Sequence, residues 1–237
     1  AEVFKTGDAL TPGDKDFLVD NILDKAGSKG TGKWTSQDAM DLPVAIPTID
    51  MAVSMRDLSV YKEEREQAAT LYQPTINPIK ISNEALLADL EKALHFCFIM
   101  AYAQGLNMLA KASDALKMDI HLTDVVKVWR QGCIIRSVML GDFYKAYQTT
   151  KGLTNLLLDA DIAKLIKEDH QSIKNIVIMA VKSGVPLPGM MSALAYFEAT
   201  CSERLPTNLI QAQRDNFGAH TYQRTDREGV FHTEWNA

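Results

Sequence analysis

The sequence predicts an all-α fold: a multi-helix, bundle-like domain with a long central helix and an extended C-terminal tail. Nearly every long segment repeats apolar residues at the spacing of one helix face. We find no convincing alternating strand and no unit of strand, glycine loop and helix in the sequence. The 237 residues, 46% hydrophobic and 23% charged, are enough to bury a substantial core.

Two helices are expected in the N-terminal region. Asp14 is a candidate N-cap for the first, whose apolar stripe ends near Gly27. Thr35 is a candidate N-cap for the second, which we expect to run through Asp41 because Pro43 cannot continue a helix.

A third helix is expected to begin near Pro47, because proline is favoured in the first turn of a helix. A highly charged helix over residues 61–69 follows, and we interpret its charge run, 62–66, as a solvated face. Pro74 and Pro78 then mark a loop.

The longest expected helix occupies the middle of the chain. Ser82 is its candidate N-cap, Glu84 suits its first turn, and the helical spacing continues to about Leu116. Between Leu94 and Leu109 the pattern is apolar nearly all round, as in a helix at the centre of a bundle.

The rest of the chain is expected to continue as helices and then to change character. Four further helices are predicted, over residues 122–136, 138–147, 159–182 and 190–201. After Pro206 comes one short amphipathic helix, and then a polar stretch, 218–237, with too few apolar residues to fold alone. We therefore expect two parts, residues 1–204 and 205–237.

Composition argues against several classes of partner. The net charge of −5 gives no global attraction for nucleic acid or an anionic membrane. The three cysteines lack a CxxC spacing and the first residues lack a signal-peptide pattern, so we expect free thiols and a cytoplasmic location. The most apolar run, 94–100, is too short to span a membrane.

The run Gly27–Trp34 sets two lysines and a threonine among three glycines. Backbone amides and ammonium groups can approach one anion closely in such a run. The run nearly fits a P-loop, but Trp34 stands where a magnesium-binding Ser or Thr is required, and a helix precedes it instead of a strand. We therefore reject nucleotide hydrolysis, and a flexible connector between two helices is the alternative interpretation.

A second candidate site lies near the C-terminus. If the segment 206–217 is helical, Arg214 lies near its C-terminal end and His220 just beyond it, so both could reach one ligand. A histidine that is neutral or cationic near pH 7 suits donation to a sugar hydroxyl or a phosphate. The alternative is that Arg214 pairs with Asp215 or a neighbouring carboxylate on a wet surface.

Other polar residues are interpreted as structural. His95 lies on an apolar helix face and is expected to be a satisfied core histidine. His121 and His170 have no second ligand at metal spacing, so no metal site is predicted. The segment 129–136 is interpreted as a packed helix junction, with Gly132 allowing close approach.

Several motifs, in the same order along the chain, resemble the 6-phosphogluconate dehydrogenase family. Residues 22–34 are similar to the family signature, and the segments 46–49, 129–136 and 211–220 are similar further along. Trp235 matches the aromatic tail of the family. The resemblance thus covers almost the whole chain.

The resemblance implies an NADP-dependent oxidative decarboxylation of 6-phosphogluconate to ribulose 5-phosphate, a reaction of the pentose phosphate pathway. By the motif match, Lys29, Thr31 and Arg56 contact the substrate phosphate, whereas Arg214 and His220 belong to a tail that enters the neighbouring subunit's site. It therefore implies a homodimer with tail exchange. The two parts become a helical substrate-binding and dimerisation domain, 1–204, and a C-terminal helix and tail, 205–237.

The resemblance also implies a part that this sequence does not contain. Complete family members begin with a Rossmann domain, which binds most of the NADP, and a helix with the catalytic lysine and glutamate; no segment here matches either. We therefore expect no catalytic residue in this chain, no bound metal, and no activity of the chain by itself. Cofactor-binding residues within it are unknown. The alternative is a noncatalytic helical module for dimerisation or sugar-phosphate binding.

Overall fold

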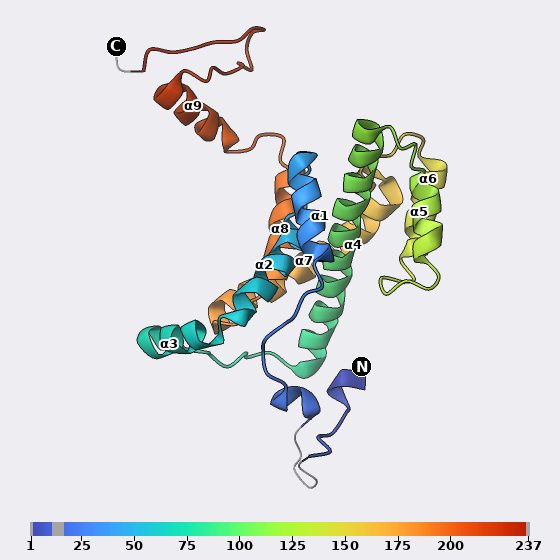
Figure 1. The fold of residues 1–237 in the computed structure, drawn as a ribbon, viewed down its shortest axis with the longest axis vertical. Coiled ribbons are helices and arrows are strands. Elements are labelled where there is room, and N and C mark those ends of the chain that lie inside the picture. Colours follow the sequence, from blue (N-terminus) through green and yellow to red (C-terminus); the bar gives the residue numbers. More distant parts are fainter. Residues whose placement is uncertain (1, 11–16, 236–237) are drawn as a thin grey trace. The chain divides into compact units, whose positions relative to one another are not determined.

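The computed structural model describes residues 2–10 and 17–235. Over this part of the chain the secondary structure is helical, with isolated β-bridges in place of a sheet, which confirms the all-α prediction (Figure 1). The α-helices are α1 (Thr31–Asp41), α2 (Pro47–Val60), α3 (Lys62–Tyr72), α4 (Asn83–Leu116), α5 (Leu122–Trp129), α6 (Leu140–Thr149), α7 (Ala160–Ser183), α8 (Pro188–Thr200) and α9 (Thr207–Gly218). Short 3-10 helices occupy Glu2–Phe4, Leu18–Asn21 and Leu156–Leu158.

The long helix α4 forms the core together with α7, which packs along it. Ser82 caps α4 as predicted, because its hydroxyl accepts a hydrogen bond from the Ala85 amide at 3.3 Å. Large apolar side chains of both helices are fully or almost fully buried, among them Phe96, Ile99, Met100, Ile166, Ile173 and Ile176. The prediction of a long central helix is confirmed.

By length and composition, α4 is also apolar enough to cross a membrane, so the apolar segment is longer than the run 94–100 suggested. A core helix of a folded protein can have the same length and apolar composition. Contacts with α7 bury part of this apolar surface, and 44% of its most apolar window is buried.

Helix boundaries near the N-terminus differ from the prediction. α1 begins at Thr31, and the hydroxyl of Thr35 donates to the Thr31 carbonyl inside the helix instead of capping it. The first predicted helix is reduced to the 3-10 turn Leu18–Asn21, and its expected cap, Asp14, lies outside the described residues. Ile22 is 59% exposed, so the apolar stripe lacks the buried partner from which a helix gains most of its stability.

The helix expected over residues 122–136 is also shorter in the structure. α5 ends at Trp129, and residues 130–139 form turns before α6. Gly132 has φ +72°, and a Cβ added there would meet nothing within 4 Å. The glycine therefore serves a left-handed turn and not the close helix approach that we predicted.

The chain divides into two compact units, residues 1–194 and 195–237, and each is described by itself. This division falls within α8, earlier than the predicted boundary at residue 204. The functional roles assigned to residues 1–204 and 205–237 stay predictions.

Candidate substrate-binding site

The glycine- and lysine-rich segment is anchored to the start of α3. The Asp24 carboxylate pairs with Lys62 at 2.9 Å and with Arg65 at 2.8 Å. Hydrogen bonds from Arg65 and Lys62 hold the pKa of Asp24 well below its usual range. The interpretation of residues 62–66 as a solvated face did not include these ion pairs, because their partner lies about 40 residues away in the sequence and gives no local signal.

The same segment is fixed to the last turns of α2. The Ala26 amide donates to the Ser59 hydroxyl at 2.8 Å, and that hydroxyl donates to the Arg56 carbonyl at 2.6 Å. Ala26 is thus held one helical turn beyond Arg56.

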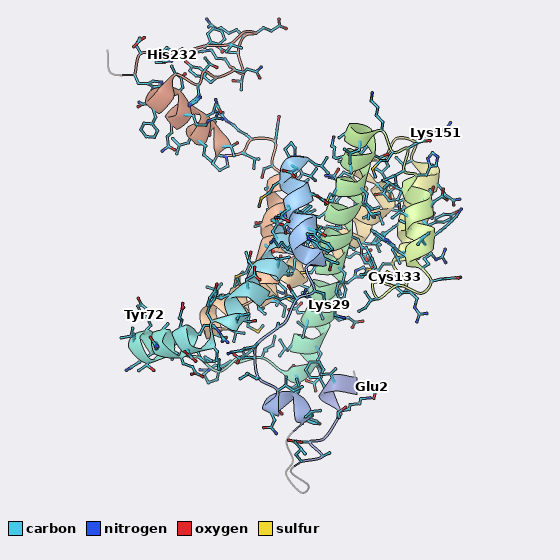
Figure 2. The ribbon with its side chains drawn as sticks, in the orientation of Figure 1. Glu2, Lys29, Tyr72, Cys133, Lys151 and His232 are labelled. Atoms are coloured by element: carbon cyan, nitrogen blue, oxygen red, sulfur yellow. The ribbon has the colours of Figure 1, made fainter. Side chains whose placement is uncertain are left out.

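Further along the segment, Gly32 packs against the preceding turn of α2. A Cβ added to Gly32 would lie 2.9 Å from Cγ2 of Val53. Val53 and Arg56 are three residues apart and therefore neighbours on the helix surface. The two attachments at Ala26 and Gly32 bring the segment that carries Lys29 alongside the turn of α2 that carries Arg56. Figure 2 labels Lys29 on this extended segment before α1.

The segment ends at the N-terminus of α1. Gly30 is the N-cap in the left-handed region, with φ +95°, and the Trp34 ring lies over it, 3.7 Å from an added Cβ. The first amides of a helix have no acceptor within it and favour an anion. Lys29, Thr31 and Arg56 are exposed, and among the described residues their side chains form no ion pair or hydrogen bond. Three donors are therefore available in one region.

Close packing at Gly32 leads to a prediction. Replacing Gly32 with alanine places a methyl group against the stiff side chain of Val53, and overpacking costs about 1–3 kcal/mol, more than alanine gains in helix propensity. We expect Gly32→Ala to lower the free energy of unfolding by about 1 kcal/mol in denaturant titration. The matched control is Gly105→Ala in α4, where nothing lies within 4 Å, and a gain of about 0.5–1 kcal/mol is expected. Equal stability of both variants would contradict the packing of α1 on α2.

The second unit carries the other two predicted site residues. Arg214 lies in the last turns of α9, which ends at Gly218, and His220 follows the helix end. A Cβ at Gly218 would lie 3.0 Å from Nε2 of His220, so the imidazole lies against that position. Positions 214 and 218 share one helix face. The two exposed side chains therefore lie on the same side of α9.

The alternative pairing of Arg214 with Asp215 is wrong. The Arg214 guanidinium contacts Gln211 at 3.4 Å, whereas the Asp215 carboxylate is buried and accepts hydrogen bonds from the tail. The tail, whose His232 is labelled in Figure 2, is organised around this carboxylate. The expectation that residues 218–237 have too few apolar residues to fold alone did not take this polar centre into account, because hydrophobic patterns do not reveal it.

His95 pairs with the buried carboxylate of Asp169, which confirms that it is a satisfied histidine, and its side chain is 35% exposed. No cluster of three or more His, Cys, Asp or Glu side chains with a geometry for metal binding occurs in residues 2–10 and 17–235.

A mostly apolar cavity of about 550 Å³ lies elsewhere in the first unit. Its walls come from α2, α4, the end of α5 and the turn before α6, including Tyr102, Trp129 and Arg136. None of the five predicted site residues lines it. We place the candidate site at the Lys29 segment, where two cations and a hydroxyl lie in one region, and not at this mostly apolar cavity.

The helical domain has clear relatives. The family model described as 6-phosphogluconate dehydrogenase, C-terminal domain, matches residues 1–235. The chain therefore belongs to the 6-phosphogluconate dehydrogenase family, and it corresponds to the C-terminal domain.

Individual relatives agree with this assignment. The decarboxylating 6-phosphogluconate dehydrogenase of Lactococcus lactis subsp. lactis is 44% identical over 92% of this chain and 46% of its own length. The NADP(+)-dependent, decarboxylating enzyme of Bacillus subtilis is 44% identical over 97% of this chain and 50% of its own length. The chain thus spans about half the length of the curated relatives it matches.

A solved structure supports the fold. The chain of Plasmodium falciparum 6-phosphogluconate dehydrogenase, described in its apo form and in complex with NADP+ or 6-phosphogluconate, superposes with a TM-score of 0.92. The identity is 41%, and the match covers 99% of this chain and 50% of the other.

Proposed function

We propose that the full-length gene product is an NADP-dependent 6-phosphogluconate dehydrogenase, in which this chain supplies substrate-phosphate-binding residues and the dimer interface. Family membership supports this proposal, as do the substrate and cofactor in the names of the relatives. The single observation that carries the site is the attachment of the Lys29 segment along the Arg56 turn of α2. No observation favours the noncatalytic alternative.

The chemistry of the substrate fits these side chains. A phosphate dianion is best received by a guanidinium, which makes forked hydrogen bonds, and an ammonium, which supplies a compact charge. Lys29 and Arg56 provide one of each, and the Thr31 hydroxyl adds a neutral donor. The three residues hold the phosphorylated end of the substrate and thereby fix the position of its remaining carbon atoms.

The tail provides the other half of the proposed receptor. Arg214 and His220 lie on one exposed side of α9 and suit contact with an anionic, hydroxyl-rich ligand. In the proposed homodimer this side enters the site of the partner subunit, so each site is complete only in the dimer.

When bound, NADP+ accepts a hydride from the substrate. Dinucleotides are commonly held by a parallel sheet and the glycine loop at the start of its first helix. The described residues form no sheet and therefore do not fit such a site. We assign NADP binding mainly to the remainder of the full-length product, and no step through NADP is assigned to residues of this chain.

A cellular location is part of the proposal. A cytoplasmic enzyme is expected, although relatives from Spinacia oleracea and Arabidopsis thaliana include forms named chloroplastic.

The proposal predicts a specific loss on mutation. Lys29→Ala and Arg56→Ala should each raise the KM for 6-phosphogluconate by about ten- to a hundredfold, since a charge-assisted hydrogen bond contributes about 1.5–3 kcal/mol. The rise should be larger at low than at high salt, because screening weakens exposed charges. The measurement is the steady-state kinetics of the full-length gene product at both salt concentrations.

The matched control is Lys111→Ala, which removes the same charge from an exposed position on α4. Its KM should stay at the wild-type value. Unchanged KM values in the Lys29 and Arg56 variants would remove both residues from the site. Absence of NADP+ reduction by the wild-type full-length product would overturn the proposed activity.

A further inference from the structure

We propose that Asp215 is the positioning residue of the tail: its buried carboxylate fixes the turn that presents His220 beside Arg214. That Asp215 shapes the turn is independent of the ligand, whereas its importance for substrate binding rests on the proposed function. The inference adds a residue outside the five predicted contacts.

The carboxylate of Asp215 is the centre of the folded tail. The residue is 0% exposed, although it is a carboxylate in a short, mostly exposed segment. Oδ1 accepts the Thr221 amide at 2.8 Å and lies 3.0 Å from Nδ1 of His232. Oδ2 accepts the Thr233 amide at 3.0 Å and the Trp235 indole N–H at 2.9 Å.

These four donors match the capacity of an ionised carboxylate, which is an acceptor at both oxygens. Burial alone would raise the pKa of Asp215, but the hydrogen bonds from His232, Trp235, Thr233 and Thr221 together hold it below its usual range. An asparagine has one oxygen and one NH₂ group in the same space. It would turn at least one backbone or indole N–H toward another donor, because only His232 among the four can change tautomer and accept, so the carboxylate suits the site better.

The turn held by Asp215 is one that the backbone does not favour. Ala219 and Thr221 have φ values of +53° and +59°, in the left-handed region, and Thr221 is β-branched. Both backbone polar groups of Thr221 are fixed by α9, its N–H by Asp215 and its carbonyl by the Gln211 amide. Such a conformation persists only where the surroundings determine it.

His220 lies between these two residues, so its direction depends on the turn. Its ring lies against Gly218, which is one helical turn beyond Arg214 and on the same face of α9. Loss of the Asp215 hydrogen bonds releases Thr221 and moves the imidazole away from Arg214. Asp215 therefore acts on the ligand through His220, without contact of its own.

The first arm of the test observes the imidazole directly in the full-length gene product. Histidine carrying ¹³C in the ring gives one NMR signal for each residue, and the signal missing in His220→Ala identifies His220. In Asp215→Asn, the His220 signal should shift and the pKa of His232, which Asp215 raises, should fall toward its ordinary value. The control, Asp226→Asn, removes an exposed carboxylate of the same tail that pairs with Arg224 and should leave the His220 signal in place. An unshifted His220 signal in folded Asp215→Asn overturns the inference.

The second arm measures the KM for 6-phosphogluconate. Asp215→Asn should raise it by about tenfold, the scale expected for a displaced binding group, and should leave the KM for NADP+ unchanged. The double variant Asp215→Asn/His220→Ala should be no worse than His220→Ala alone, because the two residues act as one unit. If Asp215→Asn raises the KM equally in the wild type and in the His220→Ala variant, Asp215 does not act through His220. A loss of folded protein would lower kcat and not raise KM.

The two arms separate this inference from the proposed function. If His220→Ala leaves KM unchanged while Asp215→Asn still moves the His220 signal, the ligand role of the tail fails and the positioning role stands. If Asp215→Asn does not fold, His232→Gln removes a single donor from the carboxylate and is judged by the same signal and the same KM.

Discussion

Gln104→Ala is expected to lower the free energy of unfolding by about 2–4 kcal/mol. Gln104 lies in α4, is 0% exposed, and reaches the start of α2. Its side-chain oxygen accepts the Thr48 amide at 3.0 Å, and its NH₂ group donates to the Thr48 hydroxyl at 2.9 Å. The truncation leaves a cavity and deprives a part-buried amide of its acceptor.

The effect is large because Gln104 replaces a missing helix cap. α2 begins at Pro47, and the residue before it, Ile46, has no side chain that could accept a hydrogen bond. Gln104 supplies that acceptor from a different helix and so ties α2, with Arg56 about two turns further on, to the core. The measurement is chemical denaturation followed by circular dichroism.

Gln67→Ala on α3 is the matched control, since Gln67 is exposed and also helical. Its stability should stay within about 0.5 kcal/mol of the wild type. If Gln104→Ala lowers the free energy of unfolding no more than Gln67→Ala does, the hydrogen bonds between α4 and α2 contribute nothing to stability.

Gly184→Ala is expected to destabilise the protein by about 3 kcal/mol, through backbone strain and overpacking together. Gly184 ends α7 in the left-handed region, with φ +74°, where an L side chain is strained. An added Cβ would lie 2.6 Å from the Thr75 carbonyl oxygen, and backbone cannot move aside as a flexible side chain does. The loop after α3 is held to this end of α7 by the Asn77 amide, which donates to the Ser183 carbonyl at 2.9 Å.

A second glycine isolates the steric part of this cost. Gly152 has φ +72°, but a Cβ there would meet nothing within 4 Å. Gly152→Ala should therefore cost only the conformational penalty, about 1–2 kcal/mol. Thermal unfolding of both variants compares them directly, and equal losses would contradict the close approach of Thr75 to α7.

Much of the fold could be predicted from the sequence because its signals are local. The cap at Ser82, proline in the first turn of α2 and the apolar spacing of α4 each depend on residues within one or two helical turns. Where local signals compete, the prediction failed. Thr35 is an acceptable cap, but Gly30 in a left-handed turn starts α1 earlier, and no pattern in the sequence distinguishes the two.

Residue types and spacing pointed to the run with Lys29 and Thr31 and to Arg214 and His220, but left a flexible connector or a surface ion pair as alternatives. Arg56 and the roles of all five residues came from the motif resemblance. The structure adds the supports that resemblance did not provide. Asp24 anchors the Lys29 segment, Gln104 caps α2, and Asp215 organises the tail, each through partners distant in sequence or by burial of a charge.

The sequence by itself determined the helical class, the position of the central helix and the family, because helix period, capping and motif order are properties of neighbouring residues. Only the tertiary structure decided that Lys29 lies alongside the Arg56 turn, and that a buried aspartate shapes the turn of His220. Both depend on contacts between segments whose separation along the chain carries no information on their distance in space, since packing and hydrogen bonding select the partners after the helices have formed.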